Sequence, residues 1–170
     1  MCNVIGADGE SRRNHGRDEL NKKLRSYGHV VFDPQIDETS HGRPYDYAID
    51  GPAEQLARAK AYVHVYQLGS ETFGGVTMLE IMRDVSLGKQ VVLWLTGAVN
   101  EKNRPVFEPA GWDEESIGGA ATRAHAKQML KQGSSMRANL IDFTAGAKNL
   151  KVVRTIEEVE EALRSFGVKI

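Results

Sequence analysis

Residues 62–95 read YVHVYQLGSETFGGVTMLEIMRDVSLGKQVVLWL, and this stretch decides the fold class. Two runs rich in β-branched and aromatic residues, at 62–68 and 90–95, have the length and composition of buried strands. Between them, apolar residues recur at helical spacing over 77–87, and Gly88 then ends the segment, as glycine often does just past a helix. A strand, a helix and a second strand in this order predict a parallel βαβ unit.

The same alternation continues outward from this unit in both directions. Thr155 with Glu158 three residues later has the pattern of a capping box and predicts a helix start near the C-terminus. The pattern as a whole predicts an α/β fold, one domain over 1–170 whose parallel sheet of about five strands carries helices on both faces. The further strands are predicted at 3–5, 29–33 and 151–153, and the further helices at 14–27, 52–60 and 156–166.

Composition excludes several classes of protein. The chain of 170 residues is 41% hydrophobic and 26% charged, which is typical of a folded domain. Its formal net charge is -1 and its basic residues are spread along the chain, so duplex nucleic acid is not an expected partner. Cys2 is the only cysteine, which excludes a disulfide framework and a cysteine-based zinc site. No apolar run reaches the roughly 20 residues that span a bilayer, and the first residues lack a signal-peptide core, so we expect a cytoplasmic protein with no membrane partner.

One long segment interrupts the alternation. Residues 97–140 contain several glycines and prolines around a single predicted helix at 120–132. Compact domains seldom contain so long a connection unless it has a function. We therefore expect this segment to be a lid or an interface.

Three predicted loops follow strands and would lie at one edge of the sheet. They are residues 6–9, 33–35 and 69–75. Ligands of open parallel sheets bind outside the carboxyl ends of the strands, where such loops meet. The third loop contains Gly74 and Gly75, which would let a ligand approach the backbone closely.

Thr77 and Glu80 follow the third loop at the start of a helix, and two interpretations fit them. As a capping box, each side chain would satisfy a backbone N–H group at the other residue. As a functional site, a carboxylate in the first turn would lie at the positive end of the helix dipole, which keeps it ionised and able to act as a nucleophile. The spacing alone does not choose between them.

The neighbouring residues resemble a known family. The run TFGGVTMLE at 72–80, followed by GKQVVL at 88–93, is similar to the signature of the nucleoside 2-deoxyribosyltransferases, in which a Gly-Thr-x-x-Glu turn precedes a helix and a Gly-Lys-x-Val strand. The matching residues are Thr77, Glu80, Gly88 and Lys89.

A second similarity lies upstream of the first. The run FDPQ at 32–35, followed by Glu54 and an alanine-rich helix, resembles the divergent nucleoside 2-deoxyribosyltransferase-like branch. The likeness covers residues 3–95, with an echo at 138–141.

The resemblance implies a flavodoxin-like fold and a reaction at the N-glycosidic bond of a nucleoside or nucleotide. Glu80 would attack the anomeric carbon of the sugar and release the base, and water or a second base would then take the sugar. Asn139 would be donated to the site of a neighbouring subunit, which implies a homodimer or a larger homo-oligomer.

Two positions depart from the family's pattern. Gly74 stands where the family usually carries an aspartate, a role that Asp33 or Glu71 would then take, and Val76 replaces a glycine. The departures leave two hypotheses open. The first is a deoxyribosyltransferase or N-glycosidase that uses Glu80, and the second is a non-catalytic module that binds or senses a nucleotide with the same loops.

The predicted site therefore has two catalytic residues, Glu80 and Asp33, and a larger set that contacts a small nucleoside or nucleotide. The histidines show no metal spacing, and the glycines fit neither a phosphate-binding P-loop nor a dinucleotide fingerprint, so no metal and no cofactor is expected. The predicted substrate-binding residues are Gly6, Asp8, Gln35, Glu54, Phe73, Gly74, Gly75, Thr77 and Asn139.

Overall fold

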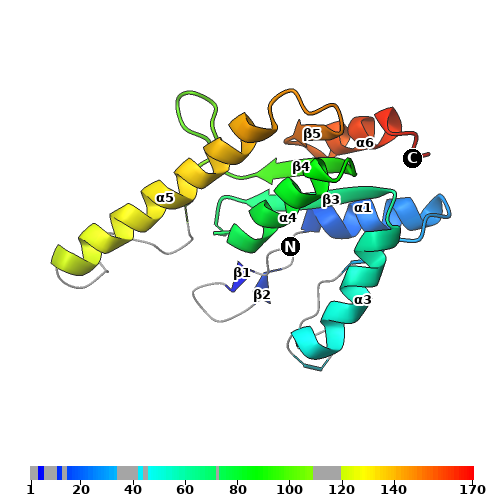
Figure 1. The fold of residues 1–170 in the computed structure, drawn as a ribbon, viewed down its shortest axis with the longest axis horizontal. Coiled ribbons are helices and arrows are strands. Elements are labelled where there is room, and N and C mark those ends of the chain that lie inside the picture. Colours follow the sequence, from blue (N-terminus) through cyan, green and yellow to red (C-terminus); the bar gives the residue numbers. More distant parts are fainter. Residues whose placement is uncertain are drawn as a thin grey trace.

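A computed structural model describes residues 4–5, 11–12, 15–33, 42–43, 46–71, 73–108 and 120–170. Its central element is a parallel sheet of three strands in the order β3-β4-β5, namely β3 (Val63–Gly69), β4 (Gln90–Thr96) and β5 (Leu150–Val153) (Figure 1). Strand β4 is central and entirely buried between its end residues, because its apolar side chains alternate between two covered faces. The protein is thus an α/β fold built on a parallel sheet.

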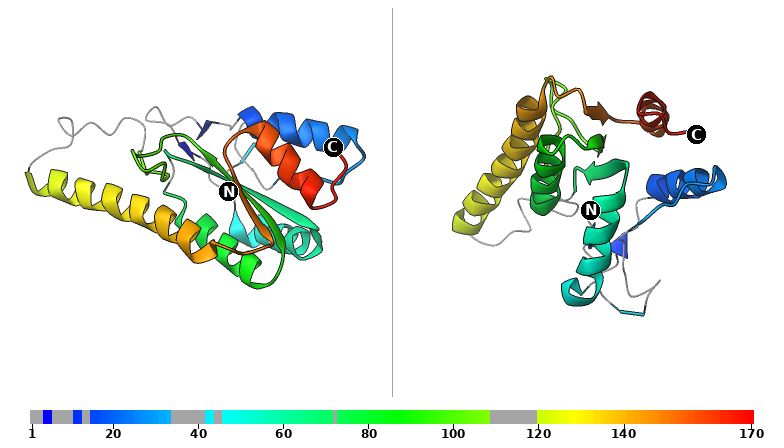
Figure 2. Two further views of the ribbon diagram at one scale, coloured as in Figure 1. Left: turned by 90° about the horizontal axis from the view of Figure 1, so that it is seen from above. Right: turned by 45° about the vertical axis from the view of Figure 1, so that its right-hand side comes forward.

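Helices cover both faces of this sheet (Figure 2). Helices α1 (His15–Ser26) and α6 (Ile156–Ser165) pack on one face, and α4 (Gly75–Ser86) and α5 (Ala120–Thr144) belong to the other. Helix α3 (Tyr47–Lys60) precedes β3 and projects away from the sheet (Figure 1). None of the helices in the described residues is long and apolar enough to cross a membrane.

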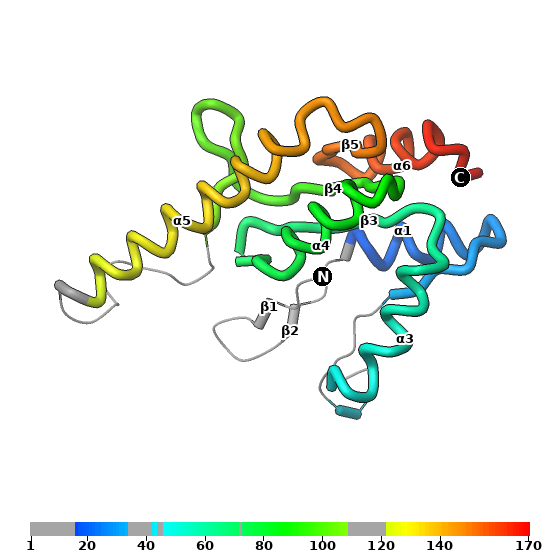
Figure 3. The backbone as a smooth tube through the Cα atoms, in the orientation of Figure 1, coloured from blue at the N-terminus to red at the C-terminus, as the bar shows by residue number. Residues whose placement is uncertain are grey.

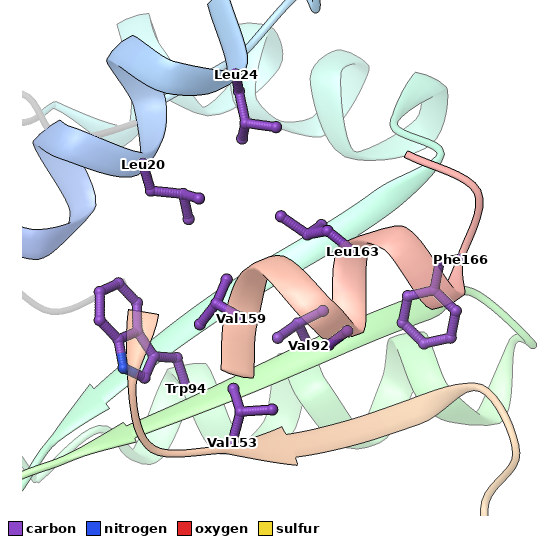
Figure 4. Close-up of a cluster of buried hydrophobic side chains, with 9 residues drawn as sticks. Leu20, Leu24, Val92, Trp94, Val153, Val159, Leu163 and Phe166 are labelled. Carbon is purple, nitrogen blue, oxygen red and sulfur yellow. The ribbon is translucent and has the colours of Figure 1, made fainter. Parts of the chain in front are cut away.

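The face under α1 and α6 holds one of two apolar cores (Figure 4). Val92 and Trp94 of β4 meet Leu163 of α6 and Leu20 of α1 there. Helix α6 is fixed in place by the predicted capping box, in which the Thr155 side chain accepts from the Glu158 backbone and the Glu158 carboxylate accepts from Thr155 in return. Because these side chains are buried together, α1 and α6 are held against this face of the sheet.

The opposite face is closed by α4 and α5. Leu68 of β3 and Leu93 of β4 pack against Ile81 of α4 and Leu140 of α5. The turn between α4 and β4 is also fixed, because the Asn149 amide donates to the backbone carbonyls of Val85 and Lys89. Helix α4 is therefore held along its length against the strand that precedes it and the strand that follows it.

The sheet differs from the prediction in the number of its strands, since the described residues give it three rather than about five. Residues 29–33, predicted as a strand, pair with no strand in the part of the chain that the structure describes, and Val30 is 101% exposed. The strand predicted at 3–5 is represented by β1 (Val4–Ile5), which pairs antiparallel with β2 (Ser11–Arg12) and not with the main sheet. β-branched composition predicts extended backbone, but pairing depends on partners distant in the sequence.

The segment predicted as a lid or interface, 97–140, includes most of α5, which is the longest of the described helices. Helix α5 runs beyond the predicted end at residue 132 to Thr144, through Gly133. A Cβ at Gly133 would lie 2.6 Å from the Phe107 ring, so this glycine permits close packing within the helix and does not end it. Residues 97–108 form a loop whose Arg104 pairs with Asp142 of α5, and the tube in Figure 3 shows this loop beside the C-terminal half of that helix.

Candidate functional site

Glu80 lies in the second turn of α4 and not at its start. The N-cap of α4 is Gly74, whose φ of 65° is left-handed, and the cap has no side-chain hydrogen bond. Thr77 is buried inside the helix, and the first turn has no acidic residue. The capping-box interpretation of Thr77 and Glu80 is therefore wrong, because the glycine turn starts the helix earlier. The prediction that Glu80 lies in the first turn, at the positive end of the helix dipole, is wrong for the same reason, since the dipole acts within the first turn.

Glu80 is instead held by a cation from another helix. Arg58 of α3 donates from Nη1 to Oε1 of Glu80, and its Nη2 lies 3.3 Å from Oδ2 of Asp84. Glu80 and Asp84 are four residues apart on α4 and so share one face of it. One guanidinium thus spans two carboxylates.

Asp84 is the centre of a buried polar cluster. Its Oδ2 accepts from the Tyr66 hydroxyl at 2.5 Å and from Nδ1 of His64 at 2.6 Å. The Tyr66 hydroxyl in turn accepts from Nη2 of Arg58 at 3.0 Å. We name Arg58, His64, Tyr66, Glu80 and Asp84 the α3–α4 cluster. It joins side chains of α3, β3 and α4 on the face of the sheet that α4 covers.

Burial and neighbouring groups shift the pKa values of Asp84, Tyr66 and Arg58. Burial opposes ionisation of Asp84, but the hydrogen bond from Tyr66 and the neighbouring His64 and Arg58 outweigh it and hold the pKa of Asp84 below its ordinary value. Burial and the adjacent Asp84 raise the pKa of Tyr66, so its hydroxyl remains a donor. Burial also opposes the charge on Arg58, but Tyr66, Glu80 and Asp84 outweigh it and raise the Arg58 pKa.

The two carboxylates differ in access to solvent. The Asp84 side chain is 6% exposed, whereas the Glu80 side chain is 22% exposed. Arg58 engages Oε1 of Glu80, and no partner among the described residues engages Oε2. Glu80 is therefore a partly exposed carboxylate with one oxygen paired and the other unengaged by the described residues, an arrangement that allows it to act as a nucleophile or to accept from a hydroxyl group.

The third predicted loop does lie at the carboxyl end of β3. Gly74 and Gly75 begin α4 there, and a Cβ at Gly75 would approach the Phe73 ring at 3.0 Å. Phe73 is partly exposed and makes an edge-to-face contact with Phe107, with ring centroids 5.7 Å apart. Phe73 is thus placed beside the helix start, where sequence reasoning expected a flat surface for a ligand.

Arg137 of α5 is a buried residue at this edge that the sequence did not indicate. Its Nη1 donates to the Gly69 carbonyl at 3.0 Å, and its guanidinium lies 5.5 Å from the centre of the Phe107 ring. Arg58 was missed as well. Neither arginine lies in a recognisable motif, because each acts on a residue brought close only by the fold.

The structure does not bring all the predicted residues together. Asp33 accepts from Asn21 of α1 at 2.7 Å and lies 3.7 Å from Nε of Arg17, so it belongs to the α1 side of the sheet, opposite α4. Glu54 lies one turn before Arg58 on α3. Asn139 is exposed on α5. Gly6, Asp8 and Gln35 lie outside the described residues.

No group of three or more His, Cys, Asp or Glu side chains within the described ranges is arranged to hold a metal ion. Comparison of the chain with known protein families, with curated proteins and with solved structures finds no match.

Proposed function

We propose that this protein cleaves or transfers the N-glycosidic bond of a nucleoside or nucleotide, with Glu80 as nucleophile. The observation that carries the proposal is the half-engaged Glu80 carboxylate, whose Oε1 is held by Arg58, whose Oε2 has no partner among the described residues, and whose side chain is 22% exposed. The resemblance of 72–80 and 88–93 to the nucleoside 2-deoxyribosyltransferase signature supports the choice of substrate class.

The proposed reaction has two displacements. Oε2 of Glu80 attacks the anomeric carbon, the bond from that carbon to the base nitrogen breaks, and the base leaves with the bonding electrons and takes up a proton from solvent. Water or a second base then attacks the same carbon, the bond from that carbon to Oε2 breaks and restores the Glu80 carboxylate, and the attacking group releases a proton to solvent. Arg58 would hold Oε1 throughout, so that the carboxylate meets the sugar in one orientation.

The direct test is release of base from deoxynucleosides and nucleotides by the purified protein, followed by chromatography with and without an acceptor base. Glu80→Gln keeps the size of the side chain and removes its charge, so we expect it to abolish release. Glu161→Gln is a matched control, because Glu161 is exposed on α6 and distant from the α3–α4 cluster. Equal turnover by the two variants would refute the proposal.

We also propose a homo-oligomer in which Asn139 serves a neighbouring subunit. Asn139 lies between Met136 and Phe143 on one exposed face of α5, and both of these apolar residues are exposed in the single chain. Mixing the Glu80→Gln and Asn139→Ala proteins should restore activity if each intact site takes one residue from each subunit. Two inactive variants that remain inactive when mixed and re-equilibrated would contradict the shared site.

We further propose that the sheet has a flavodoxin-like arrangement and that the protein is cytoplasmic. Strand β3 has a strand partner on one side only among the described residues, yet its side chains are largely buried, as in an interior strand. Gln67 of β3 is buried, and neither of its amide atoms has a hydrogen-bond partner among the described residues. A further strand beside β3 would give β3 a second strand partner and would give the Gln67 amide a neighbour to hydrogen-bond. Slow hydrogen exchange at alternate amides along the open side of β3 would support it, and fast exchange there would not.

The second candidate is a nucleotide-binding module without catalysis. It is favoured by the Arg58–Glu80 ion pair, which already neutralises the charge that attack on a sugar requires. A nucleotide that raises the melting temperature but is recovered intact after long incubation would favour this candidate. Base release lost in Glu80→Gln would exclude it.

A further inference from the structure

The α3–α4 cluster connects the partly exposed Glu80 to a buried anchor through one arginine. Nη1 of Arg58 serves Glu80, while its Nη2 donates to the Tyr66 hydroxyl at 3.0 Å and lies 3.3 Å from Oδ2 of Asp84. The anchor is well buried, since the side chains of Asp84 and His64 are 6% and 5% exposed. The arginine therefore has one nitrogen inside the protein and the other at the candidate site.

The chemistry of the guanidinium makes this connection rigid. Its five N–H donors lie in one plane, so fixing Nη2 also fixes the direction of Nη1. An arginine on a solvated helix would otherwise sample many rotamers, because its side chain is long. Asp84 and Tyr66 hold the Arg58 side chain in one rotamer, and Nη1 of Arg58 then sets the orientation of the Glu80 carboxylate.

Three donors converge on a single oxygen of Asp84. The Tyr66 hydroxyl and Nδ1 of His64 approach Oδ2 at 2.5 and 2.6 Å, and Arg58 completes the set. Because a carboxylate only accepts, Nδ1 of His64 carries the proton in this contact. Asp84 is thereby held in place from β3 as well as from α3, which makes it a fixed point for the arginine.

We propose that Asp84 and Tyr66 are positioning residues that act on Glu80 through Arg58. The proposal rests on the proposed function of Glu80 and adds to it the residues that keep its attacking oxygen in one place. Asp84, Tyr66 and Arg58 do not touch the substrate in this scheme. Their loss should therefore lower the rate of the chemical step and leave substrate binding nearly unchanged.

The test is a double-mutant cycle on base release. Asp84→Asn keeps the shape of the side chain and removes its charge, and we expect kcat to fall about tenfold while KM stays within about twofold. Arg58→Ala should cost at least as much. Because Asp84 acts through Arg58, the double variant should be no slower than Arg58→Ala alone.

Chemical rescue provides a readout that a purely structural role would not change. Methylguanidinium added to Arg58→Ala should restore part of kcat, and the recovery should be smaller in Arg58→Ala with Asp84→Asn, where the anchor for the added cation is absent. Equal recovery with and without Asp84 would overturn the proposal. So would a loss from Asp84→Asn that is undiminished in the Arg58→Ala background.

A folding defect is separated from a positioning defect by thermal unfolding of every variant. If Asp84→Asn does not fold, Tyr66→Phe completes the same cycle with Arg58→Ala, since it removes only the hydroxyl that contacts both partners. A wild-type protein that releases no base removes the proposed function and the positioning role together. An active wild type whose cycle is additive removes the positioning role alone.

Discussion

Gly97, directly after β4, should tolerate no side chain, and this expectation can be worked out in detail. Its φ is +96°, which L residues rarely adopt. A Cβ there would also collide with Ser70, approaching its Cβ at 2.7 Å and its backbone nitrogen at 3.0 Å as well as its hydroxyl. Ser70 cannot move away easily, because its N–H donates to Thr96 and its carbonyl accepts from Glu108.

Two costs therefore add in Gly97→Ala. The backbone strain is about 1–3 kcal/mol. Insertion of a methyl group into a filled space costs about 1–3 kcal/mol more. Gly88 is a matched control, because its φ of +73° carries the strain but nothing lies within 4 Å of its Cβ position. We expect Gly97→Ala to lose more free energy of unfolding than Gly88→Ala, by at least the packing cost, because the φ of Gly97 is also further from the left-handed region.

The assay is urea unfolding followed by circular dichroism, with unchanged slopes required for the comparison. Adding Ser70→Gly to Gly97→Ala should recover part of the loss, because it removes the hydroxyl and the Cβ but leaves the backbone nitrogen in place. Equal losses for Gly88→Ala and Gly97→Ala, or no recovery with Ser70→Gly, would refute the packing of the β3 and β4 ends described above.

Three further outcomes are expected. The pKa of Asp84 in the folded state lies below its ordinary value of 3.8, so its charge adds stability above about pH 4, and this stability is lost as the pH falls. The melting temperature of Asp84→Asn should therefore decline less between about pH 6 and about pH 2 than that of the unchanged protein. An unchanged decline would contradict this. Thr155→Ala should cost about 1 kcal/mol in urea unfolding by removing the cap that pairs with Glu158, and a neutral effect would count against the capping box. Leu163→Ala should cost about 2–5 kcal/mol because it opens a cavity in the core of Figure 4, and a loss below 1 kcal/mol would mean that the core is not packed as described.

Local patterns predicted the elements whose structure depends on neighbours in the sequence. The strand runs near 62–68 and 90–95 became β3 and β4, and the capping box at Thr155 became the start of α6. These follow from hydrophobic runs and side-chain caps, which act over a few residues. These elements are sufficient to predict the α/β class of the fold.

Other features depended on contacts that no local pattern contains. Gly133 resembles a helix end in the sequence, but in the structure it lies inside α5 against Phe107. The helix predicted from Pro52 begins five residues earlier, at Tyr47, because Asp46 caps it by accepting from Ala48. A proline in the first turn would have been the more common arrangement.

The candidate site also combines a residue that local sequence indicates with partners that only the fold brings close. The turn before the helix and the resemblance to a known signature indicate Glu80 in the sequence, yet the residue that holds it, Arg58, is 22 positions away on another helix. Asp84 has no motif and is recognised only from the three donors on its Oδ2. Sequence reasoning selected a carboxylate, and the fold supplied the partners that orient it.

The most direct measurement is mass spectrometry of the protein after incubation with a 2′-fluoro-2′-deoxynucleoside, whose sugar should leave the enzyme slowly once attached. We expect a mass increase of one fluorinated sugar on the peptide that contains Glu80, with an equal amount of base released, and no increase in Glu80→Gln. Base release without a sugar on this peptide, or a labelled peptide that persists in Glu80→Gln, would contradict the role of Glu80 as nucleophile.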